Sequence, residues 1–202
     1  AAAFTEQYYR DLLSSGINLA NPMLFAESVP NVGSAHVSLG FGMTAASATV
    51  IGTRTAGLEA MFLASCRIRS GEWDKAMVVM ADESHPTIDA VLGHCTGKEV
   101  QSGSAGMAFL IERIDASHAE SLPEMVAFDR SIMERGLWRS GVRGRGAFAL
   151  PEIGCVAGPA ALALEIAGGH SGNISISCND PNGFAWTLHA KANGIPQAFA
   201  TV

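Results

Sequence analysis

Residues 46–83, ASATVIGTRTAGLEAMFLASCRIRSGEWDKAMVVMADE, contain the local pattern that decides the fold class. The run at 46–51 is short, apolar and β-branched, which favours a strand. Residues 56–69 are helix-forming almost throughout, and a Ser-Gly pair ends that helix. Residues 75–81, KAMVVMA, have the uninterrupted apolar character of a strand covered on both faces. The stretch therefore predicts a strand, a tight turn, a buried helix and a second strand.

A later segment repeats this outline. Residues 157–166, AGPAALALEI, resemble residues 56–65, AGLEAMFLAS, and lead into a predicted strand at 173–177. The strands of the two segments stop at polar pairs, 82–83 and 179–180. Such self-similarity is typical of an internally duplicated α/β fold, chance similarity of two small-residue helices being the alternative. Because small residues let helices approach closely, we expect an inner helical layer between two sheets.

The flanking residues predict further elements. Residues 4–14 form an amphipathic pattern with Thr5 as a plausible N-cap, and residues 21–31, with two prolines, favour a loop or short turns. Asn31 can cap a small-residue helix running towards Leu39. Further along, the pattern predicts a polar loop at 94–104, strands at 105–114 and 125–132, and irregular structure at 134–150.

Composition restricts the class of protein. The 202 residues are 48% hydrophobic and 16% charged, with a formal net charge of −6. This balance suits one compact domain, or two halves sharing a core, and excludes bulk disorder. An acidic chain is unsuited to nucleic acid, and the short arginine-containing stretch at 135–145 is better explained as a solvated loop. No run approaches the roughly 20 apolar residues of a membrane span and no signal-peptide pattern is present, so we expect a cytoplasmic protein.

Cysteine and histidine spacings indicate no metal site. The four cysteines have no CxxC spacing, so reduced thiols are expected rather than a disulfide or zinc, and no cofactor motif is present. Four histidines likewise show no metal-ligand spacing. These residues are Cys66, Cys95, Cys155, Cys178, His36, His94, His170 and His189.

Residues 21–83, from NPMLFAESVPN to VVMADE, resemble the middle of a β-ketoacyl synthase. There a Pro, Phe and Pro-Asn pattern precedes a Leu-Gly-rich helix, the nucleophile turn, a buried helix and a strand that ends in acid. Residues 152–190, EIGCVAGPAALALEIAGGHSGNISISCNDPNGFAWTLHA, resemble the family's closing segments. The resemblance implies an α/β, thiolase-like layered fold with two similar βαβαβ halves around buried helices. The halves would span about 1–115 and 116–202 of a single reduced domain, 1–202.

The catalytic residues implied by the resemblance are missing. In active ketosynthases a cysteine at the strand-to-helix turn is activated by the helix dipole, and the matching position here holds Arg54. The family's Lys-x-x-Ile-Gly-His pattern is matched by Leu150 and Cys155 instead of lysine and histidine. The second family histidine has no counterpart, since His118 lies in a polar stretch typical of a surface. A cation at a helix N-terminus also requires an anionic or hydrogen-bonding partner nearby.

The similarity is greatest to the non-catalytic chain-length-factor branch, although those subunits carry glutamine where Arg54 stands. The resemblance implies a subunit that pairs with an active β-ketoacyl-ACP synthase as a heterodimer and shapes its acyl pocket, in fatty acid, polyketide or aryl-polyene-type biosynthesis. Acyl carrier protein would be a further partner. Family dimers join through the strand before the nucleophile turn, here 46–51. The loop with Asn179, Asp180, Gly183 and Phe184, a turn by its residue types, borders the acyl site in ketosynthases.

Other interpretations stay open. An enzyme with a rearranged site, an acyltransferase or thioester hydrolase of the same fold, is the alternative, and a homodimeric acyl- or carrier-binding module is a third. Cys155 opens a helix-like segment, so a lowered thiol pKa is conceivable, although an apolar setting raises a thiol pKa. Asp82, Glu83 and His85 end a strand, where sites occur in α/β folds, but such residues are more often a satisfied strand-end cluster with capping roles.

Overall fold

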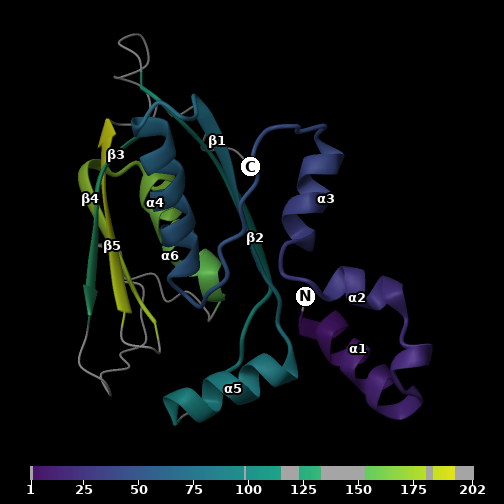
Figure 1. The fold of residues 1–202 in the computed structure, drawn as a ribbon. Helices are drawn as coiled ribbons and strands as arrows, with labels where there is room; N and C mark the ends of the chain where they lie inside the picture. Colours follow the sequence, from purple (N-terminus) through teal and green to yellow (C-terminus); the bar gives the residue numbers. More distant parts are fainter. Residues whose placement is uncertain (1, 98, 115–122, 133–152, 181–183, 194–202) are drawn as a thin grey trace. The chain divides into compact units, whose positions relative to one another are not determined.

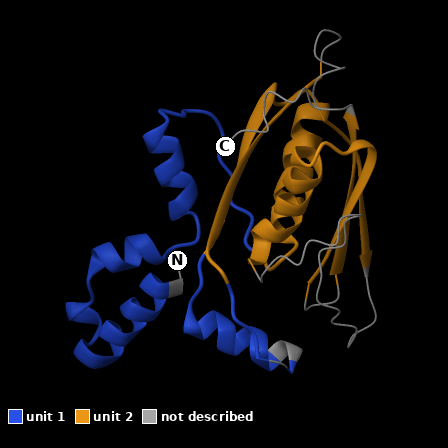
Figure 2. Cartoon of the chain, turned by 180° about the vertical axis from the view of Figure 1, so that it is seen from behind, with its two compact units in different colours: residues 1–51, 83–102 blue, residues 52–82, 103–202 orange. Residues whose placement is uncertain are grey.

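The computed structural model describes residues 2–97, 99–114, 123–132, 153–180 and 184–193. It is a mixed α/β structure that divides into two compact units (Figure 2). One unit comprises Ala1–Ile51 and Glu83–Ser102, and the other comprises Gly52–Asp82 and Gly103–Val202. We describe each unit by itself and call them unit 1 and unit 2.

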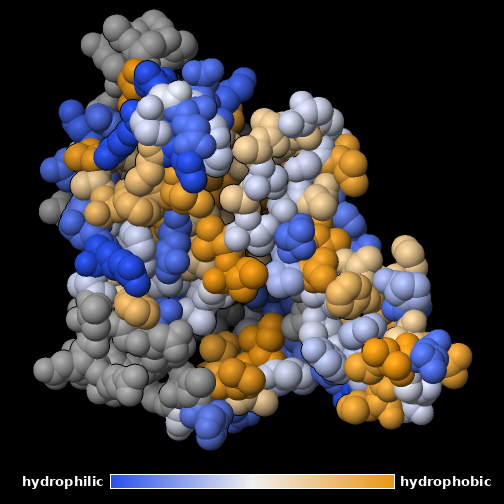
Figure 3. Space-filling model, viewed as in Figure 1, coloured by the Kyte–Doolittle hydropathy of each residue, from blue (hydrophilic) through white to orange (hydrophobic). Residues whose placement is uncertain are grey.

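Unit 1 is helical. Its elements are α1 (Ala2–Ser15), the 3₁₀ turn η1 (Ile17–Leu19), α2 (Pro22–Ser28), α3 (Val32–Gly40) and α5 (Pro86–Thr96). The predicted helix at 4–14 is confirmed as α1, and the helix from Asn31 towards Leu39 is confirmed as α3. Asn31 stands at the N-cap position of α3, but its side chain makes no capping hydrogen bond there. Figure 3 shows hydrophobic side chains gathered over α1 and the turn that follows it, where Leu13, Ile17 and Leu19 are exposed.

Several local predictions for unit 1 are wrong. Thr5 is not an N-cap; it lies inside α1, and its hydroxyl donates to the carbonyl oxygen of Ser28 at 3.3 Å. Residues 21–31 are not simply loop, because Pro22 starts α2 and the Asn21 side chain accepts the amide of Met23 at 2.9 Å. Proline is compatible with the first turn of a helix, where its missing N–H has no intrahelical partner to lose. The predicted loop at 94–104 also begins too early, since α5 continues to Thr96.

The predicted strand at 46–51 is wrong as well. These residues have no regular secondary structure, although the Thr49 hydroxyl is hydrogen-bonded to that of Ser34 at 3.0 Å. β-Branched residues fit a pleated, half-buried surface only where a neighbouring strand supplies one, and in the described residues this segment has no such partner.

Unit 2 contains the helix and strand that residues 56–81 predict. α4 (Ala56–Arg69) has the predicted bounds, and β1 (Lys75–Asp82) pairs antiparallel with β2 (Ala105–Glu112). β1 is not covered on both faces: Val78 and Met80 are buried, but Val79 between them is 46% exposed. The apolar run at 75–81 therefore predicted the strand correctly. The prediction that both faces of this strand are buried is wrong, because apolar residues also occur on exposed sheet faces.

A second sheet completes unit 2. β3 (Glu124–Ile132), β5 (Phe184–Asn193) and β4 (Ser171–Asn179) lie in that order, and both pairings are antiparallel. The 3₁₀ turn η2 (Gly154–Val156) leads into α6 (Ala157–Ala167). The helices α4 and α6 lie between the two sheets, as the small-residue patterns predicted (Figure 1). All pairings among the described strands are antiparallel, so the parallel pairs of two βαβαβ halves stay a prediction.

Two glycines let the central helices approach. A Cβ at Gly57 of α4 would lie 2.1 Å from the carbonyl oxygen of Cys155. A Cβ at Gly158 of α6 would lie 3.2 Å from Cγ of Leu58 on α4 and 2.5 Å from the sulfur of Cys178 on β4. Leu58, beside Gly57, is fully buried. The helices thus touch backbone and side chains that any larger residue would displace.

Candidate functional site

The first candidate site is the start of α4, which holds Arg54. Arg54 is only 5% exposed, and its guanidinium donates to the carbonyl oxygen of Asn179, 125 residues away, at 3.4 Å. Burial lowers the pKa of Arg54, and the negative charge of Asp180 opposes that shift. Arginine nevertheless keeps its proton at any working pH, so it is no nucleophile. The predicted partner for the cation at this helix start is confirmed.

The two threonines beside Arg54 are also hydrogen-bonded. The Thr53 hydroxyl donates to Oδ2 of Asp180 at 3.0 Å, and the Thr55 hydroxyl, which is buried, donates to Oε1 of Glu59 at 2.7 Å. Asp180 also exchanges backbone contacts with Phe184: its amide donates to the Phe184 carbonyl at 2.8 Å, and its Oδ1 accepts the Phe184 amide at 3.5 Å. Asn179 and Asp180, at the end of β4, are thereby joined to the residues that precede α4.

The second candidate site is the start of η2 and α6, which holds Cys155. Oδ2 of Asp82, at the end of β1, accepts the backbone amide of Cys155 at 3.1 Å, and the thiol contacts the Ala81 carbonyl oxygen at 3.6 Å. Gly154 makes this possible, since it has a φ of +50° and a Cβ there would lie 1.7 Å from that carboxylate oxygen. Burial, with the Asp82 charge second, raises the pKa of Cys155 to about 11. A lowered thiol pKa at Cys155 is therefore wrong.

The two sites are built alike. In each, an acidic residue at or just beyond the end of a strand binds the residues that open the helix of the other segment: Asp82 binds Cys155, and Asp180 binds Thr53. Carboxylates at helix N-termini are stabilising because they complement the exposed amides and the helix dipole. Both helix starts are therefore occupied by the protein's own side chains.

The predicted site residues fall into separate groups. Asn179, Asp180 and Phe184 lie with Arg54, whereas Gly183 lies outside the described residues. Leu150, His118 and the arginine-containing stretch 135–145 also fall on residues that the structure does not describe.

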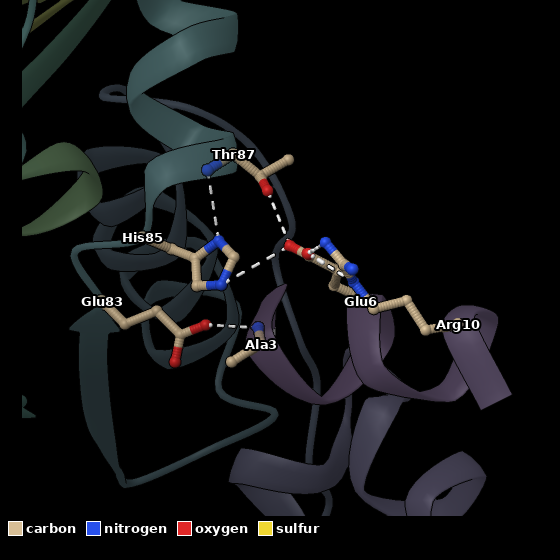
Figure 4. Close-up of polar contacts among 6 residues, drawn as sticks. All are labelled: Ala3, Glu6, Arg10, Glu83, His85 and Thr87. Atoms are coloured by element: carbon tan, nitrogen blue, oxygen red, sulfur yellow. Dashed lines mark hydrogen bonds and ion pairs between the residues drawn. The ribbon is translucent and has the colours of Figure 1, made fainter.

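Glu83 and His85 belong to unit 1, where they hold α1 (Figure 4). The Glu83 carboxylate accepts the Ala3 amide at 3.0 Å, and Nδ1 of His85 accepts the amide of Thr87 and so caps α5. Glu6 accepts the Thr87 hydroxyl at 2.7 Å and lies 3.6 Å from Nε2 of His85. Both ring nitrogens of His85 are thus engaged, and the predicted capping role is confirmed for His85. The predicted three-residue cluster is wrong, because Asp82 belongs to unit 2 and binds Cys155 instead.

Unit 1 also has an open groove of about 770 Å³ beside α3. Its lining includes Ser34, Leu39, Met43 and Ile51, and no lining side chain is titratable near neutral pH. The groove therefore offers no group for acid–base chemistry.

No cluster of three or more His, Cys, Asp or Glu that could hold a metal ion is found in the described part of the chain. Among the same residues, none of the helices is both long and apolar enough to cross a membrane.

One cluster was not predicted from the sequence. Ser175, His189 and Asp129, from three strands of the second sheet, are joined by two hydrogen bonds of 2.9 Å. The alternation in residues 171–179, SGNISISCN, is a signal that Ser175 shares one face with its polar neighbours. Nothing in the sequence indicated which histidine would lie opposite it.

Comparison with protein-family models, curated proteins and solved structures gave no significant match. The functional interpretation therefore depends on the residues and their geometry.

Proposed function

We propose that this chain is a non-catalytic, ketosynthase-like subunit of the chain-length-factor type. It pairs with an active β-ketoacyl-ACP synthase and shapes the acyl pocket of that partner. The observation that carries the proposal is Arg54: the position that resembles the nucleophile turn holds a buried cation, bonded to the carbonyl of Asn179.

Neither helix start offers a reactive thiolate. Arg54 has no lone pair to attack an acyl group at working pH. With a pKa of about 11, the Cys155 thiol stays protonated at neutral pH. The Cys178 thiol is buried and its pKa is raised to about 12 by burial. These properties support a role in which the helix starts hold the structure together rather than accept an acyl chain.

The similar contacts at the starts of α4 and α6 favour the thiolase-type architecture included in this proposal. Gly57 and Gly158 occupy equivalent positions in AGL and AGP, and each lies against the other segment's helix or strand. Asp82 and Asp180 each bind the opposite helix start. Two equivalent sets of contacts are what an internal duplication around a pseudo-two-fold axis would leave. One reduced domain with two similar halves is proposed on this ground.

The test is co-expression with a β-ketoacyl synthase encoded beside its gene, followed by size-exclusion chromatography of the tagged protein. A stable one-to-one heterodimer is expected, and the acyl products of that enzyme should change in length when this chain is left out. Elution as a monomer or homodimer in the presence of each such enzyme would contradict the pairing.

A second arm tests the missing nucleophile. The protein alone is incubated with acyl and malonyl thioesters, and peptides are mapped by mass. No condensation product and no adduct on Cys155 or Cys178 are expected. An adduct on Cys155 of the unmodified chain would refute the non-catalytic assignment.

A further inference from the structure

Three polar side chains form a line across the second sheet of unit 2. Ser175 of β4 and His189 of β5 are directly opposite in register. Asp129 of β3 is opposite Thr187, which lies two residues from His189 along β5 and therefore on the same face of the sheet. The Ser175 oxygen lies 2.9 Å from Nδ1 of His189, and Oδ2 of Asp129 lies 2.9 Å from Nε2. The intervening residues Ile176 and Leu188 are buried, so the line lies on the sheet face opposite α4 and α6.

The two hydrogen bonds select one tautomer of His189. An ionised carboxylate only accepts hydrogen bonds, so Asp129 requires the proton on Nε2. Nδ1 is then the unprotonated nitrogen, and it accepts the hydroxyl proton of Ser175. The imidazole is thus oriented with its basic nitrogen on a serine hydroxyl, which is the arrangement that activates a serine nucleophile.

We infer that Ser175, His189 and Asp129 form a nucleophilic acyl-transfer site that takes activated acyl esters and thioesters. This site is separate from the helix starts and does not depend on the proposed pairing with a ketosynthase. The subunit proposed above is non-catalytic in the condensation reaction, whereas the activity inferred here is the hydrolysis of activated acyl groups.

In the first step the Ser175 oxygen attacks the acyl carbonyl while its proton passes to Nδ1 of His189. The tetrahedral intermediate expels the alcohol or thiol, which takes that proton, and an acyl-serine ester remains. Water then gives a proton to Nδ1 and attacks the ester. The carboxylic acid leaves and the serine hydroxyl is restored.

The surroundings limit the substrates. Ser175 is exposed, and the side chain of Asp129 is 74% exposed, so its bond to His189 is screened by water. Among the described strands, β5 is paired on both sides, whereas β3 and β4 are paired on one side. On the face that carries Ser175, the nitrogen-bearing side chains Asn173 and Lys191 form the next pair in one direction, about 7 Å along the strands. Since one oxyanion donor is worth about 10²–10³ in rate, we expect turnover only of acyl groups with good leaving groups.

The same face supplies a matched control. Ser177 lies two residues along β4, and its hydroxyl is hydrogen-bonded to that of Thr187 at 2.8 Å. It therefore shares the strand, the face and the chemistry of Ser175, but it has no imidazole partner. Comparing Ser175→Ala with Ser177→Ala isolates the effect of His189.

The experiment treats the full chain with p-nitrophenyl acetate and, separately, with a fluorophosphonate probe. An initial burst of nitrophenol and a probe adduct on Ser175 are expected, both lost in Ser175→Ala and both kept in Ser177→Ala. Asp129→Asn should lower the burst rate by about tenfold, because the amide can reverse the tautomer of His189. Circular dichroism of each variant confirms the fold.

Hydrolysis that persists in Ser175→Ala would show that the histidine acts alone and would overturn the proposal. Absence of any adduct on Ser175, or equal labelling of Ser177, would overturn it as well. Because Ser175→Ala leaves the starts of α4 and α6 unchanged, it should still form the ketosynthase heterodimer. Failure of one proposal is therefore distinguishable from failure of the other.

Discussion

Substitution of Gly57 by alanine tests whether the central helices pack as closely as the structure indicates. In an ordinary helix interior this change stabilises by roughly 1 kcal/mol, because glycine has the greater backbone entropy to lose. Here the new Cβ would lie 2.1 Å from the Cys155 carbonyl oxygen, 2.9 Å from the Met80 sulfur and 3.0 Å from Cγ of Pro159. The methionine can rotate away, but the carbonyl is backbone and cannot.

The magnitude follows from two opposed contributions. Overpacking a close-packed core typically costs about 1–3 kcal/mol and occasionally more, and a backbone overlap belongs at the upper end of that range. Subtracting the roughly 1 kcal/mol gain in helix propensity leaves a net loss of about 2 kcal/mol. For a chain of this size that corresponds to a fall in Tm of about 4–8 °C.

The assay is thermal unfolding followed by far-ultraviolet circular dichroism. Gly33→Ala is the matched control, because Gly33 lies in α3 and a Cβ there would meet nothing within 4 Å. The control should leave the Tm unchanged or raise it, whereas Gly57→Ala should lower it. If Gly57→Ala kept or raised the Tm, the close approach of α4 to the start of α6 would be refuted.

Three further predictions concern the buried contacts and the N-terminal helix. Arg54→Met should lower the free energy of unfolding by about 1–3 kcal/mol in urea titrations, because the Asn179 carbonyl loses its donor; an unchanged value would show that the contact is not stabilising. Iodoacetamide at neutral pH should alkylate exposed Cys66 well before half-buried Cys155, whose pKa is about 11, and peptide mapping that gave the reverse order would contradict the raised pKa of Cys155. Hydrogen bonding, chiefly from a threonine hydroxyl, lowers the pKa of Glu6, so its contribution to stability is present above the unfolded-state pKa and is lost as the pH falls through the folded-state value. The urea midpoint of Glu6→Gln should therefore lie below that of the unmodified chain at pH 7, and the difference should shrink as the pH falls below the ordinary pKa of glutamate; a difference that stays constant with pH would exclude the linkage.

The accuracy of the sequence-based predictions depended on how local each feature is. The bounds of α4 were predicted correctly, because helix propensity and a terminating Ser-Gly are properties of neighbouring residues. The strand at 46–51 was wrong, because a strand exists only with a partner and propensity does not supply one. Pro22 was interpreted as a loop signal, although proline also suits the first turn of a helix.

The candidate sites show the same division. The sequence indicated that a cation at the start of α4 needs a partner, but only the fold showed that this partner is the Asn179 carbonyl. It likewise left open whether the Cys155 thiol is activated, and burial with a carboxylate beside it decided against activation. Period-two alternation could place Ser175 on an outward face, yet the register with β5 decided that His189 lies opposite.

By itself, therefore, the sequence determined that the chain is a core-rich α/β protein, that two small-residue helices are central to it, and that arginine stands just before the first of these helices. The tertiary structure decided the antiparallel pairing of the described strands and the hydrogen bonds of Asp82 and Asp180 to the two helix starts. It also decided the hydrogen bonds that join Ser175 to Asp129 through His189. The physical reason is range: helix propensity and side-chain chemistry belong to residues and their neighbours, whereas pairing, burial and hydrogen-bond partners are set by residues tens to more than a hundred positions away.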